Sequence, residues 1–139
     1  MRTALVDAGP MVALFDHADD AYERYTAIVG ELLSRGVQLV TTWPCVTEAS
    51  YLLAPQNHLA LLEWLRAGAV SVQNFSAADM EPMQGWMAQY TERRKSIMDF
   101  TDATLYWLAI ELDTMLVLSV DTRDFLRYRL PGGRAFEIL

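Results

Sequence analysis

The sequence predicts an α/β fold in which helices cover both faces of a mostly parallel sheet of four to five short strands. Short apolar runs that are typical of strands alternate along the chain with segments whose apolar residues recur at helical spacing. The strand-like runs are apolar on both faces, as in parallel strands that lie between two layers of helices. Together these observations predict a three-layer α/β/α architecture.

The expected strands are short apolar runs bounded by turn residues. Ala8-Gly9-Pro10 follows the first run and turns the chain into a helix, with Pro10 suited to the first helical position. Pro131-Gly132-Gly133 precedes the last run. The five runs are residues 3–7, 37–41, 69–75, 115–120 and 135–139.

The expected helices are indicated by apolar periodicity and by their end signals. Gly36 lies just past the second helix, Pro55 stops the helix that follows the second strand, and Ser76 with Asp79 forms a capping-box-like start. The helices are expected over residues 10–15, 21–33, 45–53, 58–66, 76–94 and 99–113. No repeat or linker interrupts this pattern, so residues 1–139 are expected to form a single domain.

Composition limits the class of protein. The hydrophobic fraction is 53%, above the roughly 45–50% of ordinary soluble chains, which favours a partner or a homodimer. No run reaches the length of about 18 apolar residues that a membrane span needs, and the N-terminus does not resemble a signal peptide. A single cysteine, Cys45, excludes an intramolecular disulfide and a cysteine-rich zinc site, so a cytoplasmic location is expected.

The formal net charge is -7, which argues against non-specific binding to nucleic acid, because such binding depends on Lys and Arg. Acids that are clustered around a divalent cation are an exception, since the bound cation removes their repulsion of phosphate. The positions of the acids are therefore more informative than their number.

Acids recur at corresponding places along the chain. Asp7 ends the first strand and Asp121 ends the fourth, while Glu48 lies in the helix after the second. Asp99 and Asp102 lie three residues apart in the first turn of an otherwise apolar helix, which places them on one face about 5–6 Å apart. Because sites in parallel sheets form at the carboxyl ends of the strands, these acids are expected to converge.

Such a pocket would suit a hard cation. Mg²⁺ and Mn²⁺ prefer oxygen ligands, and the absence of His and Cys from the set argues against zinc. A metal held there can activate a water and stabilise a leaving oxygen on phosphate. The reaction class that this pattern indicates is phosphodiester hydrolysis.

Four motifs, taken in order, resemble those of PIN-domain nucleases, and most closely the VapC-like toxin ribonucleases of type II toxin–antitoxin systems. The resemblance covers residues 3 to about 138 and implies a PIN-like fold. The motifs are Asp7 after the first strand, Glu48 in Pro-Cys-Val-Thr-Glu-Ala, Asp99-Phe100-Thr101-Asp102-Ala103, and the run from Ser119 to Phe125.

The resemblance implies a metal-dependent endoribonuclease with Mg²⁺ or Mn²⁺, an RNA substrate, a homodimer and a cognate antitoxin. It places the family's acidic quartet on Asp7, Glu48, Asp102 and Asp121, with Asp99 as a supporting acid. In the expected mechanism all five are catalytic, and Asp99 orients the attacking water. It also implies metal ligation by Asp7, Glu48, Asp102 and Asp121, supported by Asp124. Ala8 departs from the Ser or Thr of many relatives, which puts full activity in question, whereas Ser119 matches a hydroxyl common in the family.

Structural roles are open alternatives for several of these residues. Asp7 and Asp99 can cap the helices that they precede, and Asp124 can order the turn after Asp121. A second group is basic and suits substrate phosphate, or else a solvated helix end: Arg93, Arg94, Lys95 and Arg123. Trp43 beside Pro44 lies near the site and is open to a substrate role.

Two other functions compete with the nuclease. A catalytically silent PIN scaffold that acts through protein contacts is favoured by Ala8 and by the high apolar content. A phosphotransfer receiver-like domain would need an acid pair at the end of the first strand and a Lys near the last acid. This chain has a lone acid there and only Lys95, so the receiver pattern fits poorly.

Overall fold

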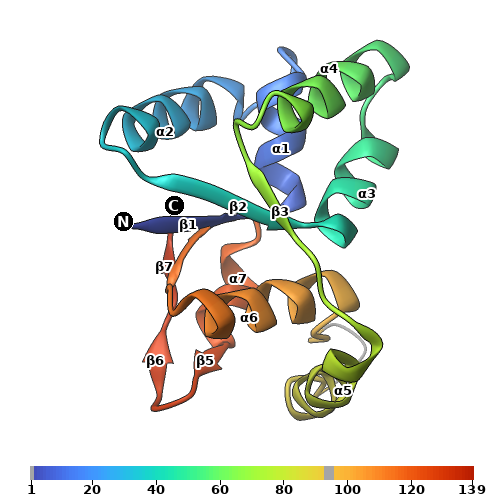
Figure 1. The fold of residues 1–139 in the computed structure, drawn as a ribbon, viewed down its shortest axis with the longest axis vertical. Coiled ribbons are helices and arrows are strands. Elements are labelled where there is room, and N and C mark those ends of the chain that lie inside the picture. Colours follow the sequence, from blue (N-terminus) through green and yellow to red (C-terminus); the bar gives the residue numbers. More distant parts are fainter. Residues whose placement is uncertain (1, 93–95) are drawn as a thin grey trace.

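A computed structural model describes residues 2–92 and 96–139 and contains a five-stranded sheet, shown in Figure 1. The strand order is β3-β2-β1-β4-β7, and every pairing between neighbours is parallel. The strands are β1 Thr3–Val6, β2 Gln38–Thr42, β3 Ser71–Gln73, β4 Leu116–Leu118 and β7 Glu137–Ile138. The prediction of a short, mostly parallel sheet is confirmed.

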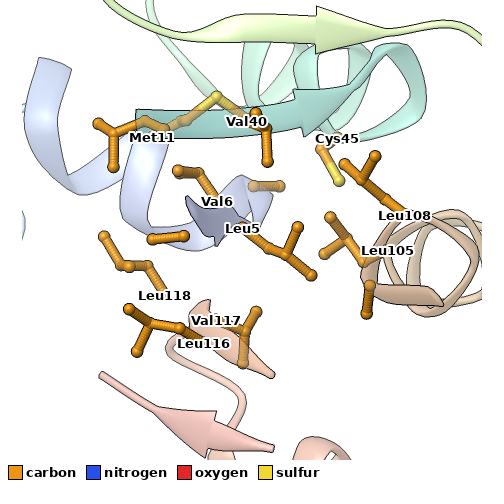
Figure 2. Packing of buried hydrophobic residues seen from close by; sticks show 14 of the residues in the cluster. Leu5, Val6, Met11, Val40, Cys45, Leu105, Leu108, Leu116, Val117 and Leu118 are labelled. Atoms are coloured by element: carbon orange, nitrogen blue, oxygen red, sulfur yellow. The ribbon is translucent and has the colours of Figure 1, made fainter. Parts of the chain in front are cut away.

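The central strand β1 holds the sheet together. Leu5 pairs with Val40 of β2 on one side and with Val117 of β4 on the other, and all three side chains are buried. Figure 2 shows these residues in one cluster with Met11 and Leu105, which come from the helices on either side of the sheet. Because full burial of one such side chain contributes about 1.5–3 kcal/mol, a strand that is apolar on both faces is stabilised by its place between two layers of helices.

Helices form the two outer layers, as Figure 1 shows. Four of them lie on one face: α1 Ala8–Phe15, α2 Tyr22–Ser34, α3 Trp43–Leu52 and α4 Pro55–Arg66. On the other face lie α5 Met80–Gln89, α6 Phe100–Leu112 and α7 Thr122–Arg127. A one-turn helix η1, Ala77–Asp79, precedes α5, and a small hairpin of β5 Arg129–Leu130 and β6 Arg134–Ala135 follows α7.

The apolar helix that was expected over residues 99–113 is α6, and every residue in it from Asp102 to Ala109 is buried. It has no polar face along this run, which explains why it lies beneath the sheet. Thr104 Oγ1 lies 2.8 Å from Thr42 Oγ1 at the end of β2 and fixes the first turn of α6 beside the carboxyl ends of the strands.

Several element boundaries differ from the sequence predictions. Pro55 begins α4 at a position where its missing N–H costs nothing. The helix expected over 76–94 is divided into η1 and α5, and α5 ends at Gln89 because Tyr90 packs against Tyr106 and Tyr128 instead of continuing the helix. The strand expected over 135–139 is split around the buried Phe136, and α7 was not predicted. No helix among the described residues is long and apolar enough to cross a membrane.

Candidate active site

Five carboxylates from four separate segments line one pocket of about 200 Å³ at the carboxyl edge of the sheet. Asp7 follows β1, Glu48 lies in α3, Asp99 and Asp102 begin α6, and Asp121 begins α7. Within the described part of the chain, the remaining lining residues are uncharged: Ala8, Gly9, Leu52 and Val120. The fold therefore gathers five of the six predicted acids around a single small space.

Asp7 is held rigidly at the base of this pocket. Its Oδ1 accepts a hydrogen bond of 2.8 Å from the Ala8 N–H, which makes it the N-cap of α1. Its Oδ2 accepts a second bond of 2.8 Å from Ser119 Oγ. Burial raises the pKa of Asp7 to about 6, and repulsion from Glu48 and Asp99 adds to that effect, although the hydrogen bonds from Ser119 and Ala8 oppose it.

Ser119 connects two of the acids. Its hydroxyl donates to Asp7 and accepts a bond of 3.1 Å from the Asp121 N–H. Asp121 lies three residues beyond the end of β4 and caps α7, where its Oδ1 accepts from the Asp124 N–H at 3.3 Å. Burial and the neighbouring Asp124 carboxyl raise the pKa of Asp121. The serine thus fixes the spacing between the acids that follow β1 and β4.

Asp102 is the second buried acid, and a tyrosine holds it. The Tyr128 hydroxyl donates to Asp102 Oδ2 at 2.6 Å, and both side chains are buried. Burial raises the pKa of Asp102 to about 8, repulsion from Asp99 adds to this, and the Tyr128 hydrogen bond opposes it. Asp99 Oδ1 in turn accepts from the Asp102 N–H at 2.8 Å as the N-cap of α6.

Glu48 and Asp99 form the exposed side of the pocket. Partial burial and repulsion from Asp99 raise the pKa of Glu48, while a hydrogen bond with Thr101 opposes the rise. Asp121 is exposed as well, so the site combines two buried, tightly held carboxylates with three that face solvent. Repulsion among the five disfavours their simultaneous ionisation unless a cation lies between them.

Known proteins resemble this chain in sequence and in fold. No family model matches the sequence. The chain is 28% identical over 140 residues to ribonuclease VapC26 of Mycobacterium tuberculosis, and the match covers 97% of this chain and 98% of that protein.

Two crystal structures have the same fold. The toxin VapC20 of Mycobacterium tuberculosis, which cleaves the sarcin–ricin loop, superposes with a TM-score of 0.69 at 18% identity over 82% of this chain and 86% of its own. VapBC2 of Rickettsia felis, bound to a DNA fragment from its promoter, superposes with a TM-score of 0.66 at 16% identity over 99% and 98% of the two chains. The chain therefore resembles a VapC ribonuclease in sequence and shares the fold of VapC proteins.

Not every predicted site residue lies at the pocket. Asp124 is absent from the described lining, and its carboxylate instead forms an ion pair of 3.2 Å with Arg127. The backbone bond at this turn is accepted by Asp121, so the proposed ordering role belongs to Asp121 rather than to Asp124. Arg123 is exposed on α7. Arg93, Arg94 and Lys95 lie outside the described residues.

Two residues that position the site were missed from the sequence. Tyr128 is 26 positions from Asp102, and no local pattern connects them. Gly9 lines the pocket, and a Cβ built there would collide with the Val120 side chain, so α1 and the loop that carries Asp121 approach closely only because residue 9 is glycine. A glycine between Ala8 and Pro10 was interpreted as a turn residue alone.

Removing the Tyr128 hydroxyl is expected to raise the pKa of Asp102 above its value of about 8, because that hydroxyl stabilises the ionised carboxylate. A hydrogen bond to a charged group contributes about 1.5–3 kcal/mol, so the proton affinity of Asp102 should rise about 10- to 150-fold in Tyr128→Phe. A carbon-detected NMR titration of the side-chain carboxyl measures this change. Tyr90→Phe is the control, since the Tyr90 hydroxyl bonds to the Arg129 backbone; equal titration of Asp102 in both variants would contradict the assignment.

The donor set of the pocket fits a hard divalent cation. It consists of carboxylate oxygens, with no His or Cys among the described lining residues. Within residues 2–92 and 96–139, no three acidic, His or Cys side chains are close enough, as they stand, to ligate one ion directly. This spacing agrees with a cation such as Mg²⁺, which keeps several waters and binds proteins through one or two carboxylates.

Proposed function

We propose that this VapC-like protein is a ribonuclease that hydrolyses RNA phosphodiester bonds with Mg²⁺ or Mn²⁺. The observation that supports it most strongly is the convergence of Asp7, Glu48, Asp99, Asp102 and Asp121 on one pocket. The similarity to ribonuclease VapC26 over nearly the whole length of both chains supports the same reaction.

The proposed roles follow from how each acid is held. Asp7 and Asp102 are fixed by Ser119 and Tyr128, and so present one rigid pair of carboxylates to a cation. Glu48 and Asp121 complete the ligand set from α3 and from the start of α7. When bound, the divalent cation supplies a Lewis acid that activates water and neutralises charge on the phosphate.

Asp99 has a separate proposed role. Its Oδ1 caps α6, which leaves Oδ2 on the exposed side of the pocket without a bond among the described residues. A carboxylate oxygen at this position can accept a hydrogen bond from water and orient it toward a phosphate. Asp124 is proposed to support the site from its position beside Asp121, where it also neutralises Arg127 next to Tyr128.

We further propose that the protein is the toxin of a toxin–antitoxin pair. The fold that it shares with the VapC20 toxin and with VapBC2 supports this biological role and a protein partner. Large apolar side chains that are more than half exposed and lie outside the wall of any aromatic cluster support burial against an antitoxin or a second copy in a homodimer: Leu52, Leu59, Val120 and Leu126. A cytoplasmic location is proposed with this role.

The test is cleavage of unstructured RNA by the purified protein. Cleavage is expected with Mg²⁺ or Mn²⁺ and is expected to stop when EDTA removes the metal, which separates it from metal-independent contaminating nucleases. Absence of cleavage together with absence of any metal-dependent stabilisation would favour the silent scaffold instead. Ala8 is the residue that favours the silent scaffold, because it lies where many relatives have a hydroxyl beside the first acid and because it lines the pocket.

A further inference from the structure

A second, larger hollow adjoins the acidic pocket and has a different lining. Its volume is about 660 Å³, and four aromatic side chains form much of its wall: Trp43, Tyr51, Phe75 and Phe100. We call these four residues with the hollow that they surround the aromatic pocket. Glu48 lines both the aromatic pocket and the acidic pocket, so the two spaces adjoin at this side chain.

The rings of the aromatic pocket are exposed to an unusual degree. Tyr51 is 88% exposed and Trp43 is 50% exposed, although aromatic rings dominate cores and interfaces because they bury so much apolar area. Phe100, at the start of α6, is 38% exposed. Exposed apolar surface gathered in one concave place marks a binding site more often than a solvated surface.

Two of the rings are held in fixed orientations. The Trp43 Nε1–H donates to Asn74 Oδ1 at 2.9 Å, which ties the indole to the loop after β3. Phe75 packs edge-on against Phe100 and also against Trp107, with ring centroids 5.8 Å apart in each pair. The pocket is therefore pre-formed, and a flat ligand can stack in it without first ordering these side chains.

We propose that the aromatic pocket binds a nucleobase of the RNA strand, next to the phosphodiester that the acids hydrolyse. The inference rests on the proposed ribonuclease function and specifies how its substrate is held. A strand with one phosphate at the acidic pocket carries bases on both sides of it, and the pocket beyond Glu48 is the adjoining surface. Aromatic faces accept any base by stacking, while the Thr47 and Thr101 hydroxyls can bond to base edges.

The charges around the pocket favour a base over a phosphate. The described lining contains no Lys or Arg, and its single charged residue is Glu48, which repels phosphate. We therefore expect a base to stack in the aromatic pocket and the phosphate to bind the cation that the acids hold.

Binding is measured best where cleavage cannot interfere. All proteins carry Asp102→Asn, and the probe is a single-stranded RNA oligonucleotide with 2-aminopurine, whose fluorescence is quenched when it stacks on an aromatic ring. Quenching is expected in the Asp102→Asn protein with Mg²⁺. Adding Tyr51→Ala or Trp43→Leu should weaken binding about 5- to 150-fold, the range for loss of one stacked base.

Two comparisons keep this result specific. Leu33→Ala removes a side chain that is 45% exposed on α2 and lies outside the described lining of the aromatic pocket, so it should leave RNA affinity within about twofold. Tyr51→Phe keeps the ring and should restore quenching. Tyr51 is so exposed that its variants should unfold at the same temperature as the parent, which removes misfolding as an explanation.

The outcomes distinguish this inference from the function on which it rests. Affinity that is unchanged in both Tyr51→Ala and Trp43→Leu would overturn the base-binding role, even if the wild-type protein cleaves RNA. Loss of quenching in these variants would support it, even if the wild-type protein proved inactive. If the two variants keep their RNA affinity but lose a co-expressed protein partner that the Asp102→Asn parent retains, the pocket is a protein-docking site and the inference is wrong.

Discussion

Asp7→Asn and Asp102→Asn are each expected to reduce Mg²⁺-dependent RNA cleavage by at least about a hundredfold. Charge stabilisation by a bound metal contributes several kcal/mol to such reactions, and each factor of ten in rate corresponds to about 1.4 kcal/mol. The amide keeps the size of the carboxylate and can still accept the bonds from Ala8 or Tyr128, so the fold should be preserved. Initial rates on a fluorogenic RNA at fixed Mg²⁺ measure the loss.

The matched control for these variants is Glu63→Gln. Glu63 pairs with Arg66 on the exposed surface of α4 and does not line the described acidic pocket, so its loss should leave the rate within about twofold. Activity of Asp102→Asn close to that of Glu63→Gln would contradict the proposed role of the buried acids.

Metal binding is expected to stabilise the protein more at pH 8 than at pH 5. The pKa of Asp7 is raised to about 6 and that of Asp102 to about 8 from an ordinary value of 3.8. Without metal, the folded chain binds more protons than the unfolded chain between pH 4 and 8. The free energy of unfolding therefore falls as pH rises through that range, and the stabilising contribution of these protonated groups is lost above pH 8.

A bound cation reverses this loss, because it needs the ionised carboxylates that burial and repulsion disfavour. At a metal concentration about 100 times the Kd, binding adds about 2.7 kcal/mol, which corresponds to a Tm increase of roughly 8 °C for a chain of this size. Thermal unfolding followed by circular dichroism at pH 5 and pH 8, with EDTA and with Mg²⁺ or Mn²⁺, measures both effects. Asp102→Asn is the control and should lose most of the metal-induced increase.

The opposite pH trend would count against the account. In EDTA, a Tm that rises between pH 5 and pH 8 would mean that the buried acids are stabilised as carboxylates by partners of their own. A metal-induced increase of the same size at both pH values would place the cation away from Asp7 and Asp102.

The gathering of the acids could be predicted because parallel strands end at one edge of a sheet. Asp7 directly follows β1, and Asp121 follows β4, so any fold that pairs these two strands in parallel brings their ends together. Asp99 and Asp102 were also predictable as neighbours, since a spacing of three places them on one turn. The capping role and the pocket role of Asp7 and Asp99 turned out to coexist in one side chain, because a carboxylate has two oxygens.

Features that depend on tertiary contacts could not be predicted from local patterns. The bond between Tyr128 and Asp102 joins α6 to the segment after α7, an element that is too short to show a periodicity. The ion pair between Asp124 and Arg127 lies within the same short helix and could not be predicted for that reason. The aromatic pocket unites α3, the loop after β3 and the start of α6, and of its four aromatic rings the sequence suggests a substrate role for Trp43 alone.

The proposed shared cation site is tested most directly by diffraction from a crystal of the wild-type protein soaked in Mn²⁺, recorded where manganese scatters anomalously. The account predicts an anomalous peak in the acidic pocket, bonded directly or through water to oxygens of Asp7, Glu48, Asp102 and Asp121. A well-occupied Mn²⁺ elsewhere on the protein, with the acidic pocket free of anomalous density at saturating metal, would contradict it.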